Sequence, residues 1–205
     1  MRPVIVGCLA AAICWFVMFS PWTSPNVNFW GVMVGATGLL AAYALLNNGS
    51  RLRELYMFHA KWVGFGILSA AALYVVFFVG DRVSAAFFAF ASPQIAGIYG
   101  TKSQASPAAI GTLLLLWIGP AEEIFWRGFV QQRLSEKYGL WKGFFIACAV
   151  YAAIHIWAFN FMLLTAALVC GLFWGWMFLK FKSVWPGLIS HAVWDLTIFI
   201  LLPIR

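Results

Sequence analysis

Seven long apolar stretches, separated by short polar connections, run through almost the whole sequence. Each is long enough to cross a lipid bilayer as a helix, which takes about 17–25 predominantly apolar residues. Hydrophobic residues make up 64% of the chain and charged residues 9%, whereas soluble proteins average about 25% charged residues. The sequence therefore excludes a soluble globular domain and predicts an all-α, polytopic transmembrane helix bundle. The seven predicted spans are 4–20, 29–46, 62–80, 107–134, 143–160, 162–180 and 186–203.

Lysine and arginine are concentrated in alternate connections between these spans. Because cytoplasmic loops carry an excess of basic residues, this asymmetry predicts a cytoplasmic N-terminus and an external C-terminus. The net charge of +7 is then a sign of topology, and we expect no nucleic-acid partner. With this orientation the outside holds Arg82, Lys102 and Arg205, and the inside holds Arg2, Arg51, Arg53, Lys61, Arg127, Arg133, Lys137, Lys142, Lys180 and Lys182.

We expect residues 1–205 to form one integral membrane domain of a multi-pass cell-membrane protein, and the compact form is typical of the bacterial inner membrane. The four cysteines lie inside apolar runs without metal-ligand spacing, so we interpret them as small core residues. The segment 83–100 is short, aromatic and interrupted by Pro93. It is open to two interpretations, as an interfacial or re-entrant piece on the outer side or as an ordinary amphipathic connection.

The fourth span carries two adjacent carboxylates, Glu122 and Glu123, although the whole chain has only six acidic residues. An ionisable group at membrane depth costs about 2.5 kcal/mol or more, so it marks a candidate functional site. Glu123 and Arg127 are four residues apart and can form an ion pair on one helix face. Glu122 lies about 100° away around the helix and has no such partner, which favours it as a general base. Pro120 predicts a kink beside both. The alternative is a helix end in the interface, with both acids facing water.

Three more ionisable residues, His155, His191 and Asp195, lie inside later spans. His191 and Asp195 are four residues apart and share a helix face. A single buried histidine is more often a hydrogen-bonded helix contact than a catalytic residue, and this interpretation is open for each of the two. At about 1.5 Å of rise per residue, however, these three groups and Glu122 all lie about 9–21 Å from the basic ends of their spans. The sequence therefore predicts one polar layer, shared by three helices and reached from the cytoplasmic side.

Such a layer suits the activation of water. A carboxylate and a neutral imidazole can share a water molecule and take its proton. A second imidazole and a short polar side chain can donate hydrogen bonds to a developing oxyanion. No serine or cysteine has a base at helical spacing, so the residues favour hydrolysis by water over a covalent mechanism.

Three short motifs carry these residues in a fixed order. Glu122–Arg127 (EEIFWR) fits E-E-x-x-x-R, Tyr151–His155 (YAAIH) resembles F-x-x-x-H, and His191–Asp195 (HAVWD) fits H-x-x-x-N/D. Together they resemble the CPBP family of intramembrane proteases, the CAAX-protease and bacteriocin-processing family, also called Abi. The resemblance implies a catalytic core over 107–203, with 1–100 forming accessory spans.

The resemblance also implies roles for the residues. Glu122 would be the catalytic base and would work with His155 on the water, while Glu123 and Arg127 would orient the site. His191 and Asp195 would hold the oxyanion, and the partners would be a membrane-bound protein or peptide substrate and the lipid bilayer. The chain departs from the family pattern twice. Tyr151 stands in place of phenylalanine, a mild change, and Asp195 stands where asparagine is common, which leaves open whether it donates to the oxyanion or orients His191.

Two alternatives remain for the function. The first is a zinc-dependent protease that uses the same Glu and His residues as metal ligands, although no HExxH motif occurs and the glutamate-pair arrangement requires no cofactor. The second is a non-catalytic membrane protein, either a bacteriocin immunity factor or a transporter in which these residues relay protons. A transporter would be expected to have paired repeats and broken helices, and the sequence shows neither.

Overall fold

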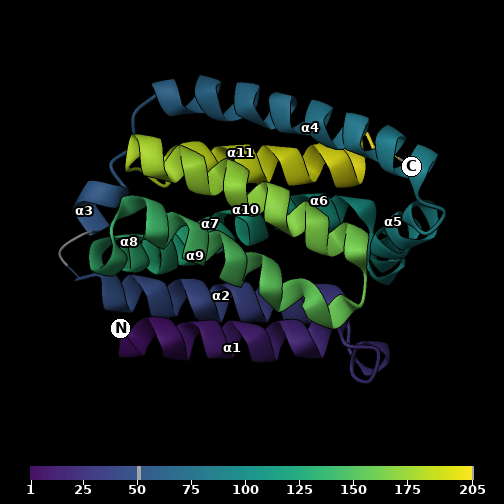
Figure 1. Ribbon diagram of the computed structural model, residues 1–205, viewed down its shortest axis with the longest axis horizontal. Coiled ribbons are helices and arrows are strands. Elements are labelled where there is room, and N and C mark those ends of the chain that lie inside the picture. Colours follow the sequence, from purple (N-terminus) through teal and green to yellow (C-terminus); the bar gives the residue numbers. More distant parts are fainter. Residues whose placement is uncertain (50–51, 205) are drawn as a thin grey trace.

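The computed structural model describes residues 1–49 and 52–204, and its elements within them are helices (Figure 1). Short 3₁₀ or π-helical turns extend or join several of the α-helices. The α-helices are α1 Arg2–Phe19, α2 Phe29–Asn48, α3 Leu52–Leu55, α4 Lys61–Phe87, α5 Ala91–Tyr99, α6 Pro107–Leu113, α7 Gly119–Phe125, α8 Gln132–Tyr138, α9 Leu140–Ala153, α10 Phe161–Phe181 and α11 Trp185–Leu196.

The all-helical class is confirmed, and six helical stretches are long and apolar enough to cross a membrane, which makes them candidates for six of the seven predicted spans. They are Arg2–Phe19, Phe29–Asn48, Lys61–Phe87, Pro107–Tyr138, Leu140–Ala158 and Phe161–Phe181. The seventh predicted span corresponds to Trp185–Leu201, a shorter apolar helix. The orientation stays a prediction, and two residues used for it, Arg51 and Arg205, lie outside the described residues.

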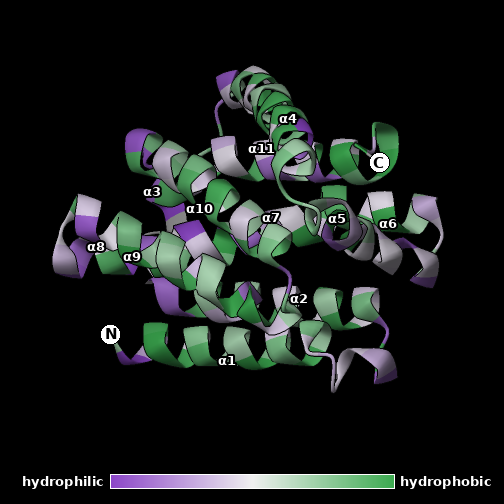
Figure 2. Cartoon of the chain, turned by 45° about the vertical axis from the view of Figure 1, so that its right-hand side comes forward, coloured by the Kyte–Doolittle hydropathy of each residue, from purple (hydrophilic) through white to green (hydrophobic). Residues whose placement is uncertain are grey.

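The long helices run side by side, with α1 and α2 on one side of the bundle and α4 on the other (Figure 1). Between these layers lie α7 and the helices that follow it, where α11 packs against α4 and α9 against α10. Hydrophobic residues run along the helices and hydrophilic ones gather mainly at the ends (Figure 2). The interior includes three fully buried tryptophans, Trp15, Trp126 and Trp174, so the core is densely aromatic around the polar residues.

Pro120 does not end the helix that carries the two glutamates. π-helical turns at Leu114–Ile118 and Trp126–Gln131 flank α7 on both sides. In the first, the Gly119 N–H bonds to the carbonyl of Leu114, five residues earlier. Proline lacks an N–H and crowds the carbonyl four residues before it, so a wider turn accommodates the ring without breaking the helix. The predicted irregularity is therefore real, and it takes the form of two π turns that frame α7.

The segment 83–100 completes α4 and forms α5, and a 3₁₀ turn at Gly100–Gln104 follows. Hydrogen bonds tie this connection to the N-terminal ends of two long helices. The Gln94 carbonyl accepts from Asn160 Nδ2 at 2.8 Å, and the Gln94 side chain accepts from Met162 N at 3.0 Å, at the start of α10. The Gln104 side chain accepts from Phe29 N at 2.6 Å, at the start of α2. Because these backbone N–H groups have no partner within their own helix, the connection satisfies them and is fixed in place.

The hairpin between α8 and α9 depends on a missing side chain. Gly143 on α9 lies so close to the backbone of Ser135 that a Cβ would collide with it. We expect Gly143→Ala to lower the melting temperature in detergent clearly, because forced overpacking costs about 1–3 kcal/mol. Gly35→Ala on α2 is the matched control, since no atom lies within 4 Å of its added Cβ. Equal melting temperatures for the two variants would contradict the packing described.

Candidate active site

Glu123 is the centre of a fully buried polar cluster. Its Oε1 lies 2.9 Å from Arg127 Nη1 and 3.0 Å from His191 Nδ1. The ion pair predicted from the i,i+4 spacing is therefore confirmed, and the same oxygen also accepts a hydrogen bond from the histidine of α11. One carboxylate oxygen thus joins α7, the π turn after it and α11.

The positive charge of Arg127 is held by aromatic rings as well as by Glu123. Its guanidinium lies 4.8 Å from the centre of the Tyr151 ring and 5.6 Å from that of Trp174. Its Nη2 also lies 3.4 Å from the backbone carbonyl of Cys170. A flat and weakly hydrated guanidinium suits such a dry, ring-lined position better than an ammonium group does. Arg127 therefore connects the cluster to α9 and α10.

His191 is fixed on three sides. Its Nδ1 faces Glu123, and its Nε2 lies 3.4 Å from Asp195 Oδ2 on the same helix. The indole of Trp174 stacks on the imidazole, with the ring centres 3.7 Å apart. The indole Nε1 of Trp174 donates a hydrogen bond to Ser190 Oγ at 3.2 Å. The predicted pair of His191 and Asp195 is present, whereas the role of Trp174 carried no signal in the sequence.

Two glycines allow α7 and α11 to approach closely enough for these contacts. A Cβ on Gly187 would lie 2.7 Å from Glu123 Oε2, and a Cβ on Gly119 would lie 3.0 Å from the backbone of Ala192. Any larger residue at either position would push the helices apart. The position of the cluster therefore depends on the absence of side chains as much as on the residues that form it.

Glu122 points away from this cluster towards a different partner. Tyr151 forms a side-chain hydrogen bond with it, while its Oε2 has no hydrogen-bond partner among the described residues. The sequence analysis treats Tyr151 as a mild replacement for phenylalanine. The structure corrects this interpretation, because the hydroxyl that phenylalanine lacks contacts the candidate base.

His155, in the 3₁₀ turn Ile154–Ala158, has both ring nitrogens engaged. Nδ1 lies 2.9 Å from the carbonyl of Tyr151, and Nε2 lies 3.0 Å from Trp15 Nε1. A carbonyl can only accept and an indole N–H can only donate, so Nδ1 carries the proton and Nε2 is the acceptor. Trp15 lies 140 positions away in the sequence, on α1, and no pattern pointed to it.

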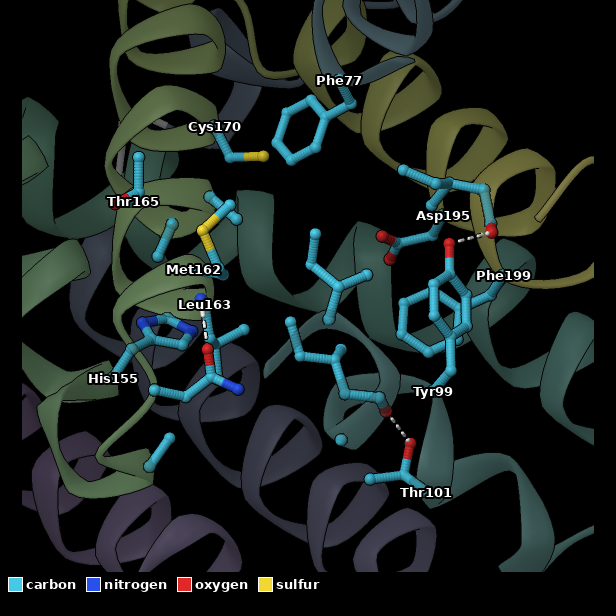
Figure 3. Close-up of a pocket in the computed structure, with 18 of the residues that line it drawn as sticks. Phe77, Tyr99, Thr101, His155, Met162, Leu163, Thr165, Cys170, Asp195 and Phe199 are labelled. Carbon is cyan, nitrogen blue, oxygen red and sulfur yellow. Dashed lines mark hydrogen bonds between the residues drawn. The ribbon is translucent and has the colours of Figure 1, made fainter. Parts of the chain in front are cut away.

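A cavity of about 860 Å³ brings the candidate residues together. Glu122, His155, His191 and Asp195 all line it, and Figure 3 shows His155 and Asp195 on different walls. The remaining candidates, Glu123 and Arg127, lie behind this wall and are absent from the lining. The predicted polar layer is thus a cavity with a buried supporting cluster.

The lining of the cavity extends away from the basic end, which is the end from which the sequence predicts access. From the polar residues the lining continues to the end of the bundle formed by the α1–α2 connection, by the segment after α5 and by the start of α10. Ser24, Thr101 and Asn160 are part of it. The basic residues of the predicted cytoplasmic side lie at the opposite end, near α3 and α8 (Figure 1). Depth along each helix correctly predicted that the polar residues share one layer. It could not predict towards which end of the bundle the cavity extends.

The candidate histidines already have partners among the other protein groups. Within residues 1–49 and 52–204, no three His, Cys, Asp or Glu side chains are placed to hold a metal ion. A catalytic zinc site needs three protein ligands around one point. His155 and His191 instead use their ring nitrogens on other protein groups.

Residues 104–197 match the family described as type II CAAX prenyl endopeptidase, Rce1-like. This part of the chain is an Rce1-like domain of the CPBP family. No match was found among curated proteins or among solved structures. All six candidate residues lie within the Rce1-like domain, and membership of the family indicates a protease. Trp15, which contacts His155, lies outside it.

The Rce1-like domain should lose stability when its buried ion pair is broken. We expect Arg127→Ala to lower the yield of folded protein sharply, because removing one partner of a buried pair costs about 3–5 kcal/mol. Lys137→Ala, a loss of an exposed basic residue one helix further on, is the control and should leave the yield unchanged. Fluorescence-detected size exclusion of both variants measures the difference, and a well-folded Arg127→Ala protein would refute a supporting role for this pair.

Proposed function

We propose that this protein is an intramembrane endopeptidase that hydrolyses a peptide bond of a membrane-associated protein or peptide by means of an activated water molecule. The observation that carries the proposal is the position of Glu122. It lies on the wall of a large cavity with one carboxylate oxygen unpartnered, beside a cluster that fixes a histidine and a second acid on the same wall. Membership of a protease family supports the same chemistry.

In the proposed reaction Glu122 takes a proton from water as the water oxygen attacks the carbonyl carbon of the substrate. The carbonyl oxygen becomes an oxyanion, and the protonated carboxyl group of Asp195, beside His191, donates a hydrogen bond to it. The carbon–nitrogen bond then breaks, and Glu122 passes its proton to the leaving nitrogen. The products are one new carboxyl end and one new amino end.

The remaining residues act by positioning. The Tyr151 hydrogen bond holds the Glu122 carboxylate, whose Oε2 is buried and has no hydrogen-bond partner among the described residues. Glu123 keeps the Nδ1 proton of His191 in place, which directs Nε2 towards Asp195. His155 can accept a hydrogen bond from the attacking water only after its Nε2 separates from Trp15, since this nitrogen has one lone pair.

Glu122→Gln tests the base. We expect cleavage to fall by at least about 100-fold with normal folding, since a general base contributes about 10²–10⁴-fold and an amide cannot accept the proton. Glu136→Gln, a change at an exposed acid, should leave cleavage unchanged. The inactive variant also serves as a trap, and mass spectrometry of the proteins that co-purify with it identifies substrates. Full function of Glu122→Gln would favour an immunity factor or a transporter instead.

Asp195→Asn tests the acid beside His191. A carboxyl group donates a hydrogen bond only while it carries a proton, so a donor role loses activity as the pH rises. Asparagine has an amide donor of the same shape that needs no added proton. We therefore expect Asp195→Asn to remain active and to extend activity to higher pH, which a pH–rate profile measures. A large loss at every pH would show that Asp195 serves as the anionic partner of His191.

A further inference from the structure

The cavity is bounded by two helices, α4 and α10, that pack against each other near the basic end of the bundle. Near the basic end, the ring of Phe181 on α10 packs against Trp62 and Phe65 of α4, with ring centres 5.3 and 4.7 Å apart. Towards α5 the two helices diverge (Figure 1), and residues from both line the cavity. The two helices are therefore in contact at the basic end, and α5 bridges them at the other end, where the ring centres of Phe90 and Phe161 lie 6.0 Å apart.

The stretch between these two contacts faces the side of the bundle. Val76, Gly80 and Val83 on α4, and Phe161 and Thr165 on α10, line the cavity and are also exposed on the perimeter. The exposed fractions of Val83 and Phe161 are 50% and 56%. Since both helices are long enough to span a membrane, these positions face lipid. The cavity thus has a lateral slot, formed by these five residues, in the half of the bundle that is remote from the basic end.

Charge assigns this half to one side of the membrane. Among the described residues outside the buried cluster, the end near the slot holds only Arg82 and Lys102, and all the other basic residues lie at the opposite end. The basic end is the one that the positive-inside rule places in the cytoplasm. The slot and the cavity therefore lie in the outer half of the membrane.

We propose that the site takes the outer half of a membrane-embedded protein segment, which enters from the lipid between α4 and α10 and whose fragment is released on the non-cytoplasmic side. This inference rests on the proposed endopeptidase function. The lining agrees with such a segment, because Phe77, Met162 and Leu163 surround the path to His155 and Asp195 (Figure 3). A tail presented from the cytoplasm would instead meet the end where Phe181 closes α10 against α4.

The first experiment determines which side of the membrane the cavity faces, without any need for cleavage. One cysteine is added at an exposed position, either Ser103→Cys next to the slot end or Lys142→Cys at the basic end. Spheroplasts are treated with a membrane-impermeant maleimide, and labelling is measured above that of the unsubstituted protein. We expect Ser103→Cys to be labelled in intact spheroplasts and Lys142→Cys only after lysis. The reverse pattern would overturn the proposal.

The second experiment blocks the slot. Gly80 and Gly64 both lie on α4 with no atom within 4 Å of an added Cβ, but only Gly80 lines the cavity. We expect Gly80→Trp to lower kcat/KM for a substrate captured by Glu122→Gln by at least about tenfold, mainly through KM, since it hinders entry and leaves the reacting groups intact. Gly64→Trp should cleave like wild type, and both variants should keep the wild-type melting temperature.

The outcomes separate this inference from the proposed function. Equal kcat/KM values for Gly80→Trp and Gly64→Trp, with an active wild type, would refute entry through the slot and leave the protease assignment intact. A wild type that cleaves nothing captured by Glu122→Gln would refute the proposed function itself. The labelling result would still decide on which side of the membrane the cavity opens.

Discussion

The structure depends on one carboxylate oxygen that is shared by a guanidinium and an imidazole inside an apolar bundle. An unpaired charge at this depth would be strongly destabilising, so Glu123, Arg127 and His191 have to remain together. Their association fixes α11 against α7 and, through the rings around Arg127, both helices against α9 and α10. The glycines at 119 and 187 are then necessary, because the helices must approach within backbone distance.

Local periodicity is the part of this molecule that the sequence predicts well. A long apolar run predicts a membrane-spanning helix, because in lipid the backbone N–H and C=O groups have few ways other than a helix to form hydrogen bonds. The pairs Glu123–Arg127 and His191–Asp195 follow from the same helical geometry, in which residues four apart face one side. The polar layer could be predicted from depth alone, because rise per residue is nearly constant along a helix.

What the sequence does not predict depends on how separate helices meet. The contact of Trp15 with His155 joins positions 140 residues apart, and the stacking of Trp174 on His191 requires the relative rotation of α10 and α11. The cavity is lined by residues from many helices, so its position is a property of no single helix. Pro120 predicted an irregular backbone. The form of the irregularity, a π turn on either side of α7, depends on the packing of the surrounding helices.

The hydrogen bond from Trp15 to His155 makes the first helix a restraint on the reactivity of a site to which it contributes no acid or base. While this bond holds, the Nε2 atom of His155 has no lone pair left to accept a hydrogen bond from water. In the proposed reaction, the Trp15–His155 hydrogen bond must first break when a substrate chain binds, at a net cost of about 0.5–1.5 kcal/mol. An Rce1-like domain that begins at residue 104 would lack Trp15, so in the proposed reaction the first helix controls how readily His155 can bind the water.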